Sequence, residues 1–130
     1  MNSSEKQTQG LGMPWEDEYG YAQAVKIGEM VWLAGQVGHD ENGQLADGME
    51  SQMLLAYKNI NKLLMGFDFT MEDVAEEVLY VTDMQAAFAA RKKYGKQFYT
   101  DPKKVASTVI VVSGLALPGQ LLEIKIMAKK

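Results

Sequence analysis

The order of hydrophobic and polar positions along the chain predicts five β-strands and two α-helices. Five stretches either alternate between apolar and polar residues or are apolar almost throughout, which is typical of strands. They cover residues 21–27, 30–37, 74–82, 105–112 and 121–127. Two segments that begin after Asp47 and Asp83 repeat apolar residues every three or four positions, as one face of a helix requires. The element order is therefore β-β-α-β-α-β-β, in the α+β class.

Particular residues mark the ends and irregularities of these elements. Gly28 is the first residue of a two-residue connection, which predicts a type II′ hairpin turn between the first two strands. Asp47 and Glu50 resemble a capping box at the start of the first helix, and Gly66 suits a left-handed end of that helix. Gly35 lies inside the second strand, where a missing side chain indicates a bulge or the close approach of another group.

The second helix carries the only arginine of the chain, Arg91. Helical spacing places it on the predicted apolar face, which consists of Met84, Phe88, Arg91, Tyr94 and Phe98. One interpretation is a side chain that covers apolar surface with its stem and keeps its charge in water. The other is an ion pair or an anion contact at an interface, for which a guanidinium is well suited. The pattern alone leaves both open.

The two helices can cover only one face of the predicted sheet. The stretches 30–37 and 105–112 are apolar on both sides, which indicates strands that are covered on both faces. Because an uncovered apolar face usually marks an interface, we expect a homo-oligomer whose sheets pack together. Glu123, in the middle of the last strand, would then lie close to a subunit boundary.

The N-terminal residues differ from the rest of the chain. Residues 1–18 are polar and show no periodicity, so we interpret them as a loosely ordered arm that becomes ordered near Trp15 or Tyr19. Trp15 is expected to plug a groove rather than to bind a ligand. Residues 19–130 are interpreted as a single domain, and the chain is long enough for a substantial core.

Composition limits the possible partners. The net charge is −4 and the pI is about 5.0, which argues against a nucleic-acid surface, because phosphate contacts need clustered lysines and arginines. The apolar runs are too short to span a bilayer and the first ten residues lack the apolar region of a secretory signal. We therefore expect a cytoplasmic protein with no membrane partner. The absence of cysteine excludes disulfides and a thiol nucleophile.

Acid–base chemistry is left to carboxylates, tyrosines and lysines. With one histidine and no cysteine, a Ser–His–Asp or Cys–His arrangement is nearly excluded, and no cofactor-binding motif is present. A metal site is conceivable where His39 stands beside Asp40 and Glu41, but such loop residues are usually solvated, so we expect no metal. Glu123 is either solvated or salt-bridged, or it lines a site and activates a water.

The sequence from about residue 19 to residue 128 resembles the Rid family, also called YjgF/YER057c/UK114. The segment GYAQAVKIGEMVWLAGQVG, residues 20–38, looks like the opening hairpin of that family. Further matches are Gly43, Ala56 with Asn59, and segments 73–74, 81–83, 117–118 and 122–124. The resemblance implies a chorismate-mutase-like fold, a homotrimer, and a small-molecule cleft between neighbouring subunits.

The best-known branch of this family hydrolyses reactive enamines and imines that pyridoxal-phosphate enzymes release. The resemblance implies a ligand contact for Tyr21, on the first strand, and a catalytic role for Glu123, which matches the glutamate that handles water. Ala34 stands where the family has a serine, immediately before Gly35, and both are candidate ligand contacts.

The chain departs from the family at the arginine that clamps the substrate carboxylate on the fourth strand. That position falls within residues 106–108, which contain no arginine, and Thr108 is the candidate ligand contact there. Arg91 falls about where the family has an asparagine. Because loss of a bidentate clamp is not a conservative change, the chain resembles a divergent branch, and 2-aminoacrylate-type deaminase activity is not expected.

Four functions are compatible with these observations. The first is a Rid-like trimer that binds a small metabolite and hydrolyses an imine without the usual carboxylate. The second is the usual enamine and imine deaminase, with Arg91 or a lysine in place of the missing arginine. The third is a non-catalytic binding or regulatory trimer. The fourth is a ribonuclease, which the net charge and the single arginine disfavour.

Overall fold

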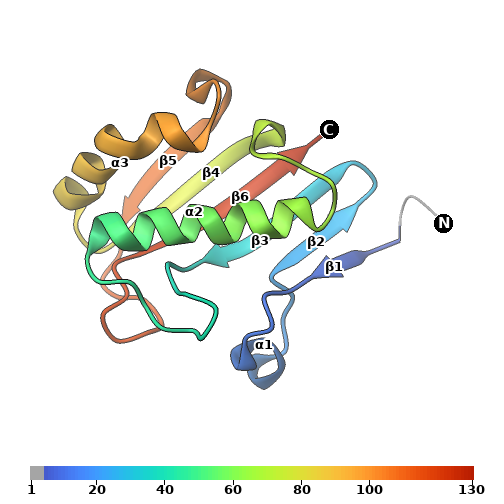
Figure 1. Cartoon of the computed structure of the whole chain (residues 1–130), viewed down its shortest axis with the longest axis horizontal. Coiled ribbons are helices and arrows are strands. Elements are labelled where there is room, and N and C mark those ends of the chain that lie inside the picture. Colours follow the sequence, from blue (N-terminus) through green and yellow to red (C-terminus); the bar gives the residue numbers. More distant parts are fainter. Residues whose placement is uncertain (1–4) are drawn as a thin grey trace.

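The computed structural model describes residues 5–130, which form one six-stranded sheet with two long helices on one face (Figure 1). The strands are β1 (Gln7–Gln9), β2 (Ala24–Ile27), β3 (Met30–Gln36), β4 (Val74–Val81), β5 (Ala106–Val111) and β6 (Leu122–Lys129). The helices are α1 (Pro14–Tyr19), α2 (Met49–Met65) and α3 (Met84–Phe98), with 3-10 turns η1 (Met71–Asp73) and η2 (Pro102–Lys104). None of the helices in this part of the chain has the length and apolarity needed to cross a bilayer.

The sheet is mixed, with the strand order β1-β2-β3-β6-β4-β5. Neighbouring strands are antiparallel except β4 and β5, which run parallel and are joined through α3. Gly28 has a φ of 58° in the hairpin between β2 and β3, as the predicted turn requires. All five predicted strands and both predicted helices are present, which confirms the α+β, chorismate-mutase-like fold.

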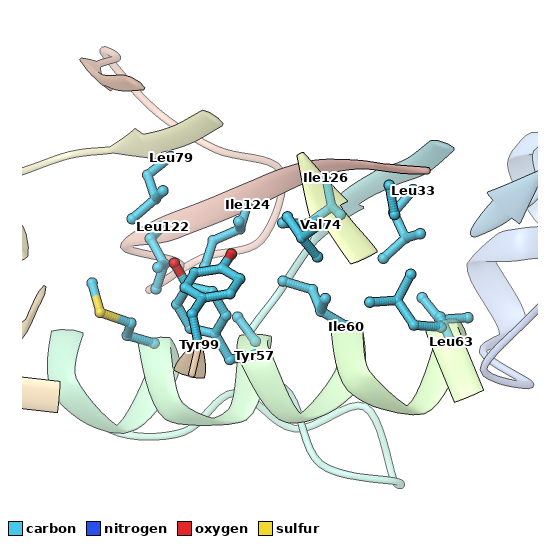
Figure 2. Close-up of a cluster of buried hydrophobic side chains, with 14 of the residues drawn as sticks. Leu33, Tyr57, Ile60, Leu63, Val74, Leu79, Tyr99, Leu122, Ile124 and Ile126 are labelled. Atoms are coloured by element: carbon cyan, nitrogen blue, oxygen red, sulfur yellow. The ribbon is translucent and has the colours of Figure 1, made fainter. Parts of the chain in front are cut away.

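The core lies between α2 and the sheet. Sheet residues such as Leu33, Ile124 and Ile126 point toward α2, where they meet Ile60 and Leu63 (Figure 2). All five are at most 1% exposed. Since burial of each such side chain contributes about 1.5–3 kcal/mol, this layer holds α2 on the sheet.

The N-terminal segment contains two elements that the sequence analysis did not predict. β1 extends the sheet by pairing antiparallel with β2, and α1 follows it. Pro14 occupies the first turn of α1, and Gly20 ends it with a φ of 72°. A helix of six residues is too short to show periodicity, but proline at its start and glycine after its end are the expected end signals.

Both predicted ends of α2 were wrong. Its N-cap is Gly48 rather than Asp47, and no side chain caps it. Gly66 has a right-handed φ of −62°, whereas Asp68 has a φ of 62°. The N–H groups of Phe69 and Asp68 bond to the carbonyls of Leu64 and Met65, which is a Schellman motif whose left-handed residue lies two residues later than predicted.

The predicted apolar face of α3 was also wrong in part. Its fully buried residues are Ala87, Ala90 and Gly95, and Phe88 is 55% exposed. Small residues let α3 approach its neighbours closely, so the large side chains lie at the edge of the contact. The helix therefore packs through a face rotated away from the predicted one.

The sheet face opposite the helices is not covered by any element of the described chain (Figure 1). Register places Trp32 beside Met127, and Tyr80 beside Glu123, on this face. The prediction that residues 105–112 are covered on both faces is wrong for the single chain. β5 is an edge strand, and Ile110 is 41% exposed.

Candidate functional site

A cleft of about 380 Å³ lies where α1, the end of β3 and the loop before β6 come together. Its lining residues are Trp15, Glu18, Tyr19, Tyr21, Gly35, Val37, Ala116, Leu117, Gln120 and Glu123. A volume in this range suits a small molecule. Three of the predicted site residues, Tyr21, Gly35 and Glu123, are brought together here.

The Glu123 carboxyl lies directly over the backbone of Gly35. The pairing of β3 with β6 shifts register between Leu33 and Gln36, so Ala34 and Gly35 form a bulge opposite Lys125, and the side chain of Glu123 reaches back to Gly35. A Cβ atom at Gly35 would overlap the carboxyl group of Glu123. Both alternatives predicted for Gly35, a bulge and a close approach, are therefore realised at one point. The absent side chain leaves the space that the carboxyl occupies.

The cleft raises the pKa values of its two central titratable residues. Burial raises the pKa of Glu123, while a contact with Gln120 and the charge of Lys125 partly oppose this shift. Burial also raises the pKa of Tyr21, and the charges of Glu16 and Glu123 raise it further. A carboxyl group with a raised pKa is suited to exchange a proton with a bound molecule near neutral pH.

The raised pKa gives a stability prediction for Glu123→Gln. A group that binds its proton more tightly in the folded state stabilises the fold fully below its unfolded pKa, about 4.3, and loses this contribution as pH rises through the folded pKa. The glutamine variant has no such loss. Its Tm should therefore exceed that of the wild type at pH 7, with a smaller difference at pH 4. Thermal unfolding across this range measures it, and a lower Tm for the variant at pH 7 would contradict it.

A single carboxylate, Glu16, anchors the α1 wall of the cleft. Its Oε2 accepts the backbone N–H groups of Leu11 and Met13, at 3.0 and 3.1 Å, and the side-chain amide of Gln23 at 3.2 Å. Gln23 in turn accepts a hydrogen bond from Gln36, at the end of β3, at 2.9 Å. This chain of polar groups links α1 to the β3 bulge.

The loop on the other side of the cleft is fixed by Gln52 of α2. Its side-chain amide donates to the carbonyls of Ala46 and Gly119, at 3.0 and 2.9 Å, and its oxygen accepts the N–H of Leu121 at 2.8 Å. Gln120 accepts the N–H of Leu117 within the same loop. Buried amides that satisfy several backbone groups hold such a loop in one conformation.

Two of the other predicted site residues lie outside the cleft lining. Ala34 precedes Gly35, and its N–H donates to the carbonyl of Gln23 at 2.8 Å. Thr108 is on β5, paired with Val78, and β4 separates its strand from that of Glu123. Within one chain, neither side chain contributes to the cleft.

Arg91, the remaining candidate, lies on the helix side of the sheet. Its guanidinium forms an ion pair of 2.9 Å with Glu77, whose side chain is fully buried. Glu77 also accepts hydrogen bonds from Tyr57, Tyr99 and Ser107, at 2.6, 2.7 and 2.5 Å. Of the two interpretations of Arg91, the ion pair is observed, but within the chain rather than at an interface.

The two tyrosines of this cluster act as hydrogen-bond donors. Burial raises the pKa of Tyr57 and of Tyr99, and the negative charge of Glu77 adds to both shifts. Both hydroxyls therefore stay protonated and hold the carboxylate together with Arg91. Figure 2 shows the two rings between α2 and the sheet, where they form part of the core.

His39 is a structural residue in the described chain. It is 3% exposed, its Nδ1 lies 2.8 Å from the carbonyl oxygen of Asp40, and its ring packs edge-on against Trp15. Between residues 5 and 130, no three His, Cys, Asp or Glu side chains are grouped in a way that could hold a metal ion.

Sequence reasoning missed several of the residues that surround these sites. Glu18 and Tyr19 belong to α1, which was not predicted, and Gln120 lies in an irregular loop. Glu77 had a usable signal. Strand alternation puts it on the same face as Leu79 and Val81, and a carboxylate on a buried apolar face needs a cation.

The protein belongs to a class of small α+β proteins. Its members share this strand order, with two helices on one face of the sheet. The family model described as Endoribonuclease L-PSP matches residues 16–130, and the chain belongs to this family. The resemblance to the Rid family, read from the hairpin and the closing strand, is thereby confirmed.

Relatives and solved structures agree with this assignment. A RutC family protein of Aquifex aeolicus is 28% identical, over 85% of this chain and 88% of its own length. The RutC family protein YjgH of Escherichia coli is 27% identical, over 86% and 84% of the two chains. The crystal structure of Rv2704 from Mycobacterium tuberculosis, a YjgF/YER057c/UK114 family member, matches with a TM-score of 0.84 and 28% identity, covering 97% and 100% of the chains.

Proposed function

We propose that the protein is a homotrimer that binds a small metabolite in this cleft and hydrolyses an imine or enamine there. The observation that carries the proposal is the Glu123 carboxyl, which has a raised pKa and is seated over Gly35 beside Tyr21. The uncovered sheet face supports assembly, because its half-buried residues would pack against the sheets of two further copies. The cleft would then lie close to a subunit boundary.

The chemistry requires one group that first takes a proton and then returns it. Water adds to the C=N carbon while Glu123 accepts a proton from the water. The protonated carboxyl then donates this proton to nitrogen, which gives a carbinolamine. Glu123 next takes the proton of the new hydroxyl group and passes it to the amino nitrogen as the C–N bond breaks, so that ammonia and a carbonyl compound leave. An enamine enters the same route after protonation at carbon turns it into an imine. Tyr21 shapes the wall beside the reacting atoms.

A panel of imines generated in situ tests this proposal. Amino-acid oxidases supply imines with an α-carboxylate, and amine oxidases supply imines without one. The wild type should accelerate hydrolysis of at least one set, and Glu123→Gln should lower that rate by at least about 100-fold, because a general acid–base group contributes this much. Sedimentation should show a trimer for both proteins. A monomer at micromolar concentration, or a fully active variant, would contradict the proposal.

A second function, a non-catalytic binding or regulatory trimer, is favoured by one observation. The substrate-carboxylate arginine of the family has no counterpart in residues 106–108, and Arg91 is already paired with the buried Glu77. Absence of acceleration across the whole panel, with ligand still bound in the cleft, would favour this function. A ribonuclease remains disfavoured, because Glu18 and Glu123 line the cleft and would repel phosphates.

A further inference from the structure

The charged residues of the cleft are all of one sign. Glu18 and Glu123 contribute carboxylates, and none of the residues between 5 and 130 that line the cleft is a lysine, arginine or histidine. The charge of Lys125, two residues along β6, acts on Glu123, but Lys125 does not line the cleft. Among the described residues, a negatively charged ligand would therefore meet two carboxylates in the lining and no cation within it.

Basic side chains gather at other places. His39, Lys58 and Lys62 line a separate groove of about 310 Å³ between α2 and the N-terminal segment. Arg91 is held by Glu77 on the helix side of the sheet. The negative charge of the cleft is thus set by the residues of its walls. It does not simply follow from the net charge of −4 of the whole chain.

Aromatic rings accompany the two carboxylates. Trp15 and Tyr19 lie on α1, and Tyr21 follows it directly. Tyr19 is 75% exposed and Tyr21 is 42% exposed, so both rings are available to a bound molecule. A cation is attracted to the face of an aromatic ring by about 0.5–2 kcal/mol, depending on how far it is removed from water.

We propose that this cleft selects positively charged ligands, namely a protonated amine or an iminium ion without an α-carboxylate. The inference rests on the proposed function, since it concerns the same cleft and names its substrate class. An iminium carbon is more electrophilic than that of a neutral imine, so the charge that the rings and carboxylates bind is also the charge that favours attack. Water adds to that carbon, and a carbonyl compound and ammonium leave.

Three probes of nearly the same shape test the preference for charge. Choline is a cation, 3,3-dimethylbutan-1-ol is its neutral analogue, and 3,3-dimethylbutanoate is an anion. The reporter is the indole N–H signal of Trp15, identified by its persistence in Trp32→Phe, since the chain has two tryptophans. Choline should bind at least about 10-fold more tightly than the alcohol, and the butanoate more weakly than either.

Two variants assign the preference to the cleft. Glu18→Gln should reduce the choline-to-alcohol ratio about 3- to 10-fold, as expected for loss of one nearby charge. Glu41→Gln removes an exposed carboxylate from the other groove and should leave the ratio unchanged. Equal or tighter binding of the butanoate, an unchanged ratio in Glu18→Gln, or no shift of the Trp15 signal with any probe would overturn the inference.

The result of the choline experiment can be distinguished from the result of the imine panel. Hydrolysis of α-carboxylate imines by a protein that does not prefer choline would end the charge inference and leave the proposed hydrolysis intact. A clear preference for choline without hydrolysis of any imine would support the charge inference and contradict the proposed hydrolysis.

Discussion

Replacing Arg91 with alanine is expected to lower the free energy of unfolding by about 3–5 kcal/mol, the usual cost of leaving a buried charge without its partner. Glu77 has no exposed side-chain surface, and Arg91 forms the one ion pair found for it in the described chain. The hydroxyls of Tyr57, Tyr99 and Ser107 would still donate to it but carry no charge. Thermal unfolding at fixed protein concentration should show Tm falling by more than about 10 °C.

Two controls separate this effect from a general response to charge removal. Lys93→Ala breaks the exposed pair with Glu50, at 3.4 Å, and should leave Tm unchanged because surface pairs contribute little. Glu77→Gln combined with Arg91→Met replaces the buried pair by neutral groups of similar size and should regain most of the lost stability. If Arg91→Ala unfolds at the wild-type temperature, the pair does not stabilise the fold, and Arg91 is free to serve a ligand.

The second large effect is expected at Gly35. Gly35→Ala should lower the hydrolysis rate by at least about 100-fold, because the added Cβ takes the space of the Glu123 carboxyl, and a displacement of about 1 Å at a reacting group can cost that much. The measurement is kcat/KM with an imine that the wild type hydrolyses. The sheet should still form, since the contact is with a side chain rather than with backbone.

A matched glycine serves as the control for this variant. A methyl group added at Gly114 would have no neighbouring atom within 4 Å, and Gly114 lies outside the left-handed region, so Gly114→Ala should retain activity and stability. Combining Gly35→Ala with Glu123→Ala removes the overlap, so the Tm of the double variant should be no lower than that of Gly35→Ala, but the rate should not return. Wild-type kcat/KM in Gly35→Ala would show that the position of the Glu123 carboxyl is unimportant.

The elements with clear periodicity could be predicted from the sequence, and so could the centre of the cleft. Gly35 was predicted to meet another group because an isolated glycine inside a strand seldom has another reason, and the group is Glu123. Glu123 was a candidate from its place in the last strand, and the family resemblance gave it a catalytic role and added Tyr21. The cleft brings both together with Gly35. Their proximity depends on β3 and β6 being neighbours, which a single sequence does not reveal.

What could not be predicted depends on short elements and on partners distant in the sequence. α1 has too few residues for a periodic pattern, so the wall that holds Glu18 and Tyr19 was missed. The face of α3 was misjudged because hydrophobic spacing favours large side chains, whereas close packing selected Ala87 and Ala90. The partner of Arg91 lies on a neighbouring strand, and helical spacing alone does not identify it.

The way α1 is attached has a consequence for which changes the cleft should tolerate. The Glu123 carboxyl belongs to β6, in the interior of the sheet, whereas one wall of the cleft belongs to a short helix that Glu16 links to Gln23. Substitutions at Trp15, Glu18 or Tyr19 should alter this wall without disturbing the strands that position Glu123. In the proposed function, chemistry and ligand choice are therefore carried by separate segments, and altering α1 should change the ligand while leaving the Glu123 reaction in place.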